Sequence, residues 1–252
     1  MRAAKIFALC VSLATATACV TSGPTAKFGV QEGHSSFVPA RIVILGCQPW
    51  PEGARFAELP LSTAKASEFR ELCDAADEFL LGGFQGQPYM KGYSPEYVDE
   101  ALAKVGDDDL LSLLPKLWAH RASDETSVAN APTFYSKTIV SRPEWLAWLN
   151  RLSTHVHSAD AVLMPFITYA YERRYDDRGL QVAERSAAVV VLLIDTNNGS
   201  LLWAGGRDTI VSQKRLNNGN VPGDLAYPAW TEVKNRLLIE ELWKEFPGRQ
   251  VY

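Results

Sequence analysis

The residues whose types and spacing best suit a metal ion are two histidines and an aspartate. His155 and His157 are separated by one residue, and Asp160 follows shortly after them. On a β-strand this spacing would put both imidazoles on one face beside the carboxylate, which is a plausible ligand set for zinc. The apolar pattern that leads into the segment is helical, however, and on a helix positions i and i+2 diverge by about 200°. We therefore predict the polar end of a helix here, and no metal site.

Other segments contain the residue types of a binding or catalytic site without the required spacing. The glycine-rich loop at residues 82–87 lacks the Gly-Lys-Ser/Thr ending that holds phosphate groups, so we predict no nucleotide site. The acidic run at residues 107–109 lacks the ligand spacing of a calcium loop, and its charge better suits a helix N-terminus. No Gly-x-Ser-x-Gly segment marks a serine nucleophile. The sequence thus predicts no cofactor and no catalytic constellation.

The clearest chemical role belongs to Cys19. Two basic residues, an apolar run at residues 6–14 and small residues at 16–18 precede it, which is typical of a secretory signal peptide over residues 1–18. The segment resembles the lipobox of bacterial lipoproteins, although Ala16 stands where Leu or Val is usual. The resemblance implies cleavage before Cys19 and acylation of that cysteine, with palmitate among its lipids. The alternative is cleavage of the same bond by the ordinary signal peptidase, which would release a soluble periplasmic protein.

A lipid on Cys19 would attach the protein to a membrane. The apolar run is shorter than the roughly 20 residues that a membrane-spanning helix needs, and no later stretch approaches that length. Burial of acyl chains contributes about 0.8 kcal/mol per methylene, so several chains on one cysteine would make a lasting anchor. Val20 rather than Asp follows the cysteine. By resemblance to the sorting rule of bacterial lipoproteins, this implies the outer membrane, with the protein facing the periplasm.

The charge of the exported chain argues against nucleic acid as a partner. Without residues 1–18, 234 residues remain, with 23 basic and 29 acidic side chains. This excess of negative charge repels phosphate backbones, and no dense basic cluster offsets it. Residues 19–38 are rich in Gly, Ser and Thr, so we expect them to carry the lipid and to form a flexible tether. We expect residues 39–252 to form a single domain.

Two cysteines in the predicted domain could form a disulfide. Cys47 ends an apolar, β-branched run at residues 41–47 that we predict as a buried strand. Cys73 lies on the apolar face of the helix that follows. The oxidising envelope would allow them to pair, whereas two buried free thiols are the alternative, since spacing alone does not supply the geometry of a disulfide.

Helical periodicity dominates the chain before residue 160. Each predicted helix has an apolar stripe, and most have a recognisable boundary signal, such as Ser94 with Pro95 at a start or a Ser141-x-x-Glu144 capping box. The predicted helices cover residues 62–82, 94–106, 110–118 and 141–156. Between the first two helices, a loop bounded by glycine and proline carries side chains that belong to no stripe. Because functional contacts concentrate in such loops, we predict a partner-binding loop with Phe84, Tyr89, Met90 and Tyr93.

Strand patterns replace the helical ones after residue 160. Residues 161–171 and 181–195 are dense in apolar and β-branched side chains, and Asn198-Gly199 predicts a tight hairpin turn into a returning strand at 201–211. A last amphipathic helix is expected at residues 228–246, before Pro247-Gly248.

This C-terminal pattern resembles the envelope domains related to the TolB N-terminal domain, the curli-secretion lipoprotein and the lipoprotein activators of penicillin-binding proteins. The resemblance is carried by Ala159 and Asp160 at a strand start and, in the hairpin, by Leu193, Ile194, Asp195, Gly199 and Trp203. It implies a single α/β (α+β) domain in which amphipathic helices pack on a mixed, mainly antiparallel sheet. Residues 83–157 depart from the family pattern as a helical insertion.

Together these features predict a non-catalytic envelope lipoprotein. It would be anchored by Cys19 and would bind another envelope protein or a cell-wall component such as peptidoglycan. The alternative is a periplasmic hydrolase or metal-dependent envelope enzyme. That alternative requires a closed cleft holding two or more of the side chains of His120, His155, His157 and Asp160.

Overall fold

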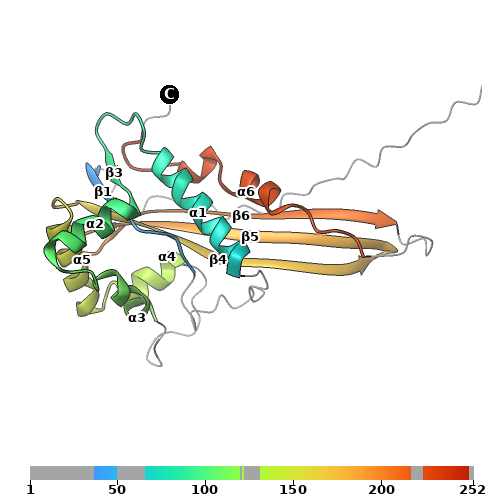
Figure 1. Cartoon of the computed structure of the whole chain (residues 1–252), viewed down its shortest axis with the longest axis horizontal. Coiled ribbons are helices and arrows are strands. Elements are labelled where there is room, and N and C mark those ends of the chain that lie inside the picture. Colours follow the sequence, from blue (N-terminus) through green and yellow to red (C-terminus); the bar gives the residue numbers. More distant parts are fainter. Residues whose placement is uncertain (1–36, 50–65, 120, 122–130, 217–223, 250–252) are drawn as a thin grey trace, which may run out of the picture.

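Three long antiparallel strands form the centre of the computed structural model (Figure 1). They are β4 (Ala161–Asp177), β5 (Leu180–Asp195) and β6 (Leu201–Leu216). In the β5–β6 turn, the carbonyl of Asp195 accepts the N–H of Gly199 at 2.9 Å, and Gly199 has a φ of 71°. Glycine adopts this left-handed conformation without strain, and the predicted hairpin is confirmed. β4 and β6 run past their predicted ends at residues 171 and 211.

The structure describes residues 37–49, 66–119, 121, 131–216 and 224–249. The predicted signal peptide, Cys19 and most of the predicted tether lie outside these ranges, as does His120. Within them, no helix is both long enough and apolar enough to cross a membrane.

Short parallel strands complete the sheet, whose order is β3-β1-β4-β5-β6, with β2 also paired to β4. They are β1 (Arg41–Ile44), β2 (Gln48–Pro49) and β3 (Lys91–Tyr93). The strand predicted over residues 41–47 is therefore shorter, and β2 forms a separate pairing. β3 lies in the segment predicted as a loop, because three residues carry too little periodicity to reveal a strand, and its pairing with β1 is what makes it one.

The helices confirm most of the predicted segments. Ser94 caps the second helix by accepting the N–H of Tyr97 at 3.3 Å, and Gly106 ends it with a φ of 71°. Their bounds are α1 (Ala66–Gly82), α2 (Pro95–Val105), η1 (Leu111–Leu113), α3 (Leu114–Trp118), α4 (Ala131–Phe134), the π-helical η2 (Tyr135–Ile139), α5 (Pro143–His155), α6 (Trp230–Leu237) and η3 (Glu240–Trp243).

Two helix predictions are wrong in detail. The Ser141 hydroxyl donates to the carbonyl of Thr138 at 2.9 Å instead of capping α5, which begins at Pro143 without a side-chain cap. The helix predicted over residues 228–246 is broken after Leu237, and a 3₁₀ turn follows. The break allows Trp243 to turn inward onto other aromatic rings, so tertiary packing overrides the helical pattern.

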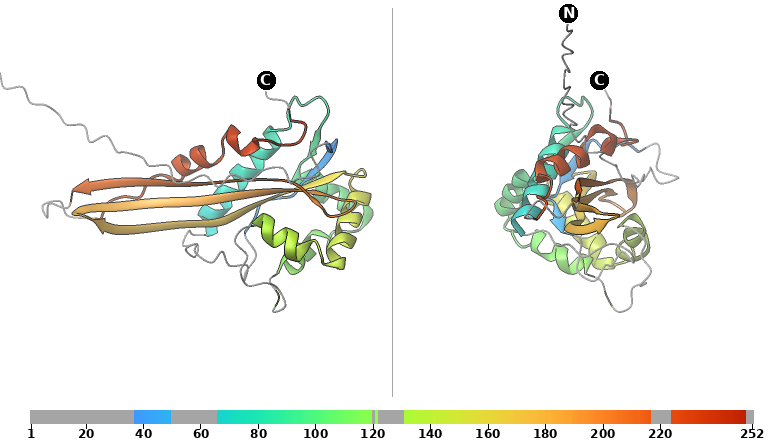
Figure 2. Two further views of the ribbon diagram at one scale, coloured as in Figure 1. Left: turned by 180° about the vertical axis from the view of Figure 1, so that it is seen from behind. Right: turned by 90° about the vertical axis from the view of Figure 1, so that its right-hand side faces the viewer.

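The helices divide between the two faces of the sheet (Figures 1 and 2). One face packs against α1, α6 and η3 around Trp203, and the other packs against the helices between residues 95 and 155, around Trp118 and Trp145. The predicted α/β class, with its mixed and mainly antiparallel sheet, is confirmed. The extent of a single domain over residues 39–252 stays a prediction.

Candidate binding surface

The far halves of β4, β5 and β6 extend beyond the helices of the insertion as an arm (Figures 1 and 2). One face of the arm is covered by residues 224–229, which precede α6. There Arg174 donates to the carboxylate of Asp224 at 3.0 Å, and Arg185 donates to the carbonyl of Pro228 at 2.8 Å. Both guanidinium groups also lie over the ring of Tyr227. This face is thus used for internal packing.

The opposite face of the arm carries alternate residues of β4, namely Tyr169, Tyr171, Arg173 and Tyr175, and we call it the tyrosine face. Successive side chains of a strand point to opposite faces, so these four share one side. Tyr169 and Tyr171 form a small apolar cluster with Ala188, separate from both cores. Arg173 and Tyr175 are exposed. The tyrosine face therefore begins where the helical layer of the insertion ends.

A β-bulge determines which residues reach this face. The register of β4 against β5 shifts between Ile167 and Tyr169, and Thr168 occupies the irregularity, with its hydroxyl 3.4 Å from the carbonyl of Ala188. A bulge inserts one residue and reverses the alternation beyond it. Phe166 before the bulge and Tyr169 after it consequently lie on the same side of the sheet.

An ion pair holds the outer part of the tyrosine face in order. The guanidinium of Arg173 bonds to the carboxylate of Glu184, which is only 3% exposed, and lies over the rings of Tyr171 and Tyr175 at 5.7 and 4.9 Å. The hydroxyl of Tyr175 donates to the other oxygen of Glu184 at 3.0 Å. The hydrogen bond to Glu184 raises the pKa of Arg173. Such charge-assisted bonds and stacking leave Arg173 few alternative positions.

The inner part of the tyrosine face consists of phenol groups and the partly buried carboxyl group of Asp208, which interacts with Tyr169 and whose pKa is raised by burial. Burial raises the pKa of Tyr169 to about 12, and it also raises the pKa of Tyr171. Ser186, fully buried beneath this face, donates to the carbonyl of Thr209 at 2.7 Å. Phenols that stay protonated at neutral pH are suited to recognition by contact and hydrogen bonding, and they are poor proton acceptors.

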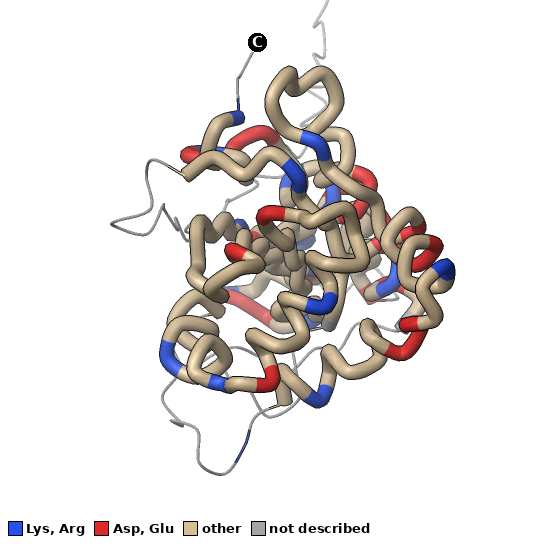
Figure 3. The backbone as a smooth tube through the Cα atoms, turned by 90° about the vertical axis from the view of Figure 1, so that its left-hand side faces the viewer, with Lys and Arg blue, Asp and Glu red and all other residues tan. Residues whose placement is uncertain are grey.

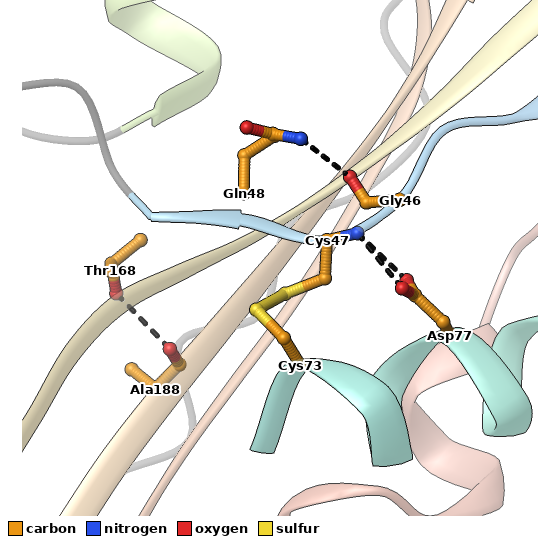
Figure 4. Close-up of a disulfide and its surroundings, with 7 residues drawn as sticks. All are labelled: Gly46, Cys47, Gln48, Cys73, Asp77, Thr168 and Ala188. Atoms are coloured by element: carbon orange, nitrogen blue, oxygen red, sulfur yellow. Dashed lines mark hydrogen bonds between the residues drawn. A yellow bond between two sulfur atoms is a disulfide. The ribbon is translucent and has the colours of Figure 1, made fainter. Parts of the chain in front are cut away.

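A disulfide bond joins Cys47, before β2, to Cys73 on α1, with their Cα atoms 5.1 Å apart (Figure 4). The N–H of Cys47 donates to both carboxylate oxygens of Asp77, at 2.9 and 3.0 Å. Burial raises the pKa of Asp77 to about 6, and the nearby charges of Asp74 and Glu96 add to this effect. The disulfide and this carboxylate both tie the edge of the sheet to α1.

The residues predicted as a partner-binding loop are separated by the fold. Phe84, Met90 and Tyr93 are buried, whereas Tyr89 is 73% exposed. Phe84 packs edge-on against Trp243 at 5.4 Å. Because β3 pairs with β1, the loop is drawn into the sheet and its side chains enter the core. Of the predicted group, only Tyr89 is available at the surface.

The described histidines have separate partners rather than a common cleft. The Nε2 of His155 lies 3.1 Å from a carboxylate oxygen of Asp107, and the ring of His157 stacks on Tyr93 and Tyr97. Asp160 instead binds Arg41. In the described part of the chain, no group of three or more potential ligands could hold a metal ion.

The tyrosine face is not among the features predicted from the sequence. Its signal is a Tyr or Arg at every second position from residue 169 to 175, but the sequence pattern predicts a strand that ends at residue 171. At the opposite end of the molecule, the basic and acidic residues of the described backbone are interspersed (Figure 3).

No protein-family model matches the sequence, and no curated protein matches it. Solved structures that resemble the chain include the lipoprotein GNA1162 from Neisseria meningitidis, with 14% identity over 73% of this chain and 88% of that one, and a TM-score of 0.32. The PelC dodecamer from Paraburkholderia phytofirmans has 10% identity over 90% and 99%, with a TM-score of 0.36. The LpoB C-terminal domain from Escherichia coli has 11% identity over 71% and 88%, with a TM-score of 0.32. Likenesses at this level carry no argument about function.

Proposed function

We propose that the protein is an envelope lipoprotein that acts without catalysis, by binding another envelope protein or a cell-wall component. The observation that carries this proposal is the tyrosine face. Tyrosine and arginine are enriched among the residues that dominate protein interfaces. Here Arg173 is held by Glu184 and two aromatic rings, so little side-chain entropy remains to be lost on binding.

Export to the periplasm is supported by the N-terminal pattern and by the disulfide between Cys47 and Cys73. Disulfides persist in oxidising compartments such as the bacterial periplasm. In the proposal, a lipid on Cys19 fixes the protein to the outer membrane, and residues 19–38 act as the tether. A flexible tether of this length has a root-mean-square span of about 25 Å, which confines the domain near the membrane and raises its effective concentration for a partner there.

The binding proposal is tested by placing a photo-cross-linking amino acid at position 175 of the full chain in intact envelopes. We expect one defined envelope component to be captured from this position. Position 104 is the matched control, because Lys104 is an exposed side chain on α2, away from the arm. Equal capture from both positions, or none from position 175, would contradict the proposal.

The anchoring proposal has its own test. A Cys19→Ala variant should lose incorporation of labelled palmitate and leave the membrane fraction. If it remains fully membrane-bound, the lipid on Cys19 is not the anchor.

A further inference from the structure

A groove of about 470 Å³ lies where α1 ends, away from the tyrosine face. Its lining includes Glu78, Phe79, Gly83, Glu240, Trp243 and Arg249. Small-ligand and peptide sites commonly have volumes of this order. The groove brings together the last turns of α1, the 3₁₀ turn η3 and the end of the described chain.

Aromatic rings form the floor of the groove. Phe79 stacks on Trp243 with ring centroids 6.1 Å apart. A Cβ on Gly83 would lie 2.2 Å from the Trp243 ring, so this close approach requires glycine. Aromatic faces carry partial negative charge and attract cations such as guanidinium groups.

One guanidinium already occupies part of the groove. Arg249 lies over the Trp243 ring at 5.1 Å, donates to Glu240 at 2.8 Å and donates to the carbonyl of Gly83 at 3.3 Å. Its side chain is only 10% exposed. An aromatic face, a carboxylate and a carbonyl thus hold one cation, which shows the chemistry that this groove accommodates.

The part of the groove formed by Glu78 and Phe79 also has a carboxylate and an aromatic ring, but no cation from the described residues is bound there. Among the described residues, none forms an ion pair with the exposed carboxylate of Glu78, and the Phe79 ring beside it is only partly buried. The last turn of α1 has no basic residue, although the partial negative charge at a helix C-terminus favours one. This half therefore offers a carboxylate, an aromatic ring and the negative end of a helix.

We propose that this groove binds a basic segment of a partner protein, with an arginine or lysine of the partner lying against Phe79 and pairing with Glu78. The volume of the groove exceeds that of one side chain, so a short peptide segment fills it better than a single small cation does. Arg249 occupies the adjoining position, on Trp243 and Glu240, and its positive charge repels the partner's cation. The inference is independent of the tyrosine face and adds a second binding site.

The test uses the full mature chain and a fluorescent nonapeptide of alternating arginine and glycine, with binding measured by anisotropy. We expect saturable binding that weakens as salt rises and is absent for the same peptide with glutamate in place of arginine. Glu78→Gln and Phe79→Leu should each weaken binding about tenfold. Arg249→Ala should strengthen it several-fold, because a neighbouring positive charge is removed and the adjoining position on Trp243 and Glu240 becomes free for a second basic side chain of the peptide.

Glu100→Gln is the matched control, since Glu100 is an exposed carboxylate on α2, away from the groove. This variant should bind the peptide as the unchanged protein does. Circular dichroism of each variant checks that it is folded. Absence of binding at millimolar peptide, or equal weakening by Glu78→Gln and Glu100→Gln, would overturn the inference. Neither result would affect cross-linking from position 175.

Discussion

Arg41 and Asp160 are joined by two hydrogen bonds across 119 residues of sequence. The backbone N–H of Arg41 donates to one carboxylate oxygen of Asp160 at 2.9 Å, and its guanidinium donates to the other at 3.1 Å. The N–H of Ala40 also donates to Asp160, at 3.0 Å. A single carboxylate therefore fixes the start of β1 beside the start of β4. This gives a structural role to the aspartate of the Ala159-Asp160 pattern.

Replacing this carboxylate should destabilise the fold. In Asp160→Ala, two backbone N–H groups lose their acceptor and the Arg41 guanidinium loses one of its two acceptors. We expect the free energy of unfolding to fall by about 2–3 kcal/mol. Asp160→Asn keeps one oxygen and should lose less. Urea unfolding measures both. Asp108→Ala, at an exposed carboxylate, should change stability by less than about 0.5 kcal/mol, and an equal loss in the two alanine variants would refute the role of Asp160.

Removal of Arg173 should destabilise the protein, because it leaves the buried carboxylate of Glu184 without a cation. Arg173→Ala leaves a carboxylate at 3% exposure without its cation, and we expect a loss of about 2–3 kcal/mol, reduced from the fully buried case because Arg173 is solvated. Adding Glu184→Gln should restore part of the stability. Chemical denaturation of the single and double variants gives the coupling energy, and a strictly additive result would show that the pair is not coupled.

Asp77 should make stability depend on pH between about 4 and 6. Its pKa is raised from 3.8 to about 6, so the folded state binds a proton more tightly than the unfolded state in this range. Stability contributed by this group is therefore present at low pH and is lost as the pH rises through about 6.

The Asp77→Asn variant removes that titration. It should match the unchanged protein at pH 4 and exceed it at pH 7 by up to about 2 kcal/mol, after allowance for partial solvent exposure. Thermal unfolding at both pH values provides the comparison, and Asp99→Asn on the exposed side of α2 is the control. A difference between unchanged protein and Asp77→Asn that does not vary with pH would contradict the raised pKa.

A side chain at position 83 should destabilise the protein, whereas a side chain at position 82 should be tolerated. In Gly83→Ala the new Cβ would meet the Trp243 ring at 2.2 Å, and the forced shift should cost about 1–3 kcal/mol. Gly82→Ala has nothing within 4 Å of the new Cβ and should be neutral or slightly stabilising. Thermal unfolding of the two variants tests this contrast, and equal transition temperatures would show that Trp243 moves away at no cost.

The Cys47–Cys73 bond should be detectable by thiol labelling. These thiols should resist a maleimide reagent in the denatured, unreduced protein and react after reduction. The double variant Cys47→Ser, Cys73→Ser should lose about 2–4 kcal/mol of unfolding free energy, the usual range for a loop of this size. Full labelling before reduction would show that the cysteines are free.

Local interactions explain which predictions from the sequence succeeded. Ser94 and Gly106 bound α2 through contacts within a few residues, and Asn198-Gly199 forms its turn in the same way. Apolar periodicity located most helices and the long strands, because it reflects burial of one face. The capping box at Ser141 failed because α5 begins at Pro143, so that Arg142 and not Ser141 occupies the N-cap position, and the Ser141 hydroxyl instead donates to the carbonyl of Thr138.

What the sequence determined by itself was most of the long helices and strands, because these follow from local periodicity and turn chemistry, and the α/β class was implied by the family resemblance. Only the tertiary structure decided the strand at residues 91–93, the end of α6 at Leu237 and the bulge at Thr168. Each depends on contacts between distant segments: pairing with β1, packing around Trp203, and the register of β4 against β5. The tyrosine face arises from the last of these, because the bulge decides which residues of β4 lie on that side of the sheet, and local periodicity does not reveal a bulge.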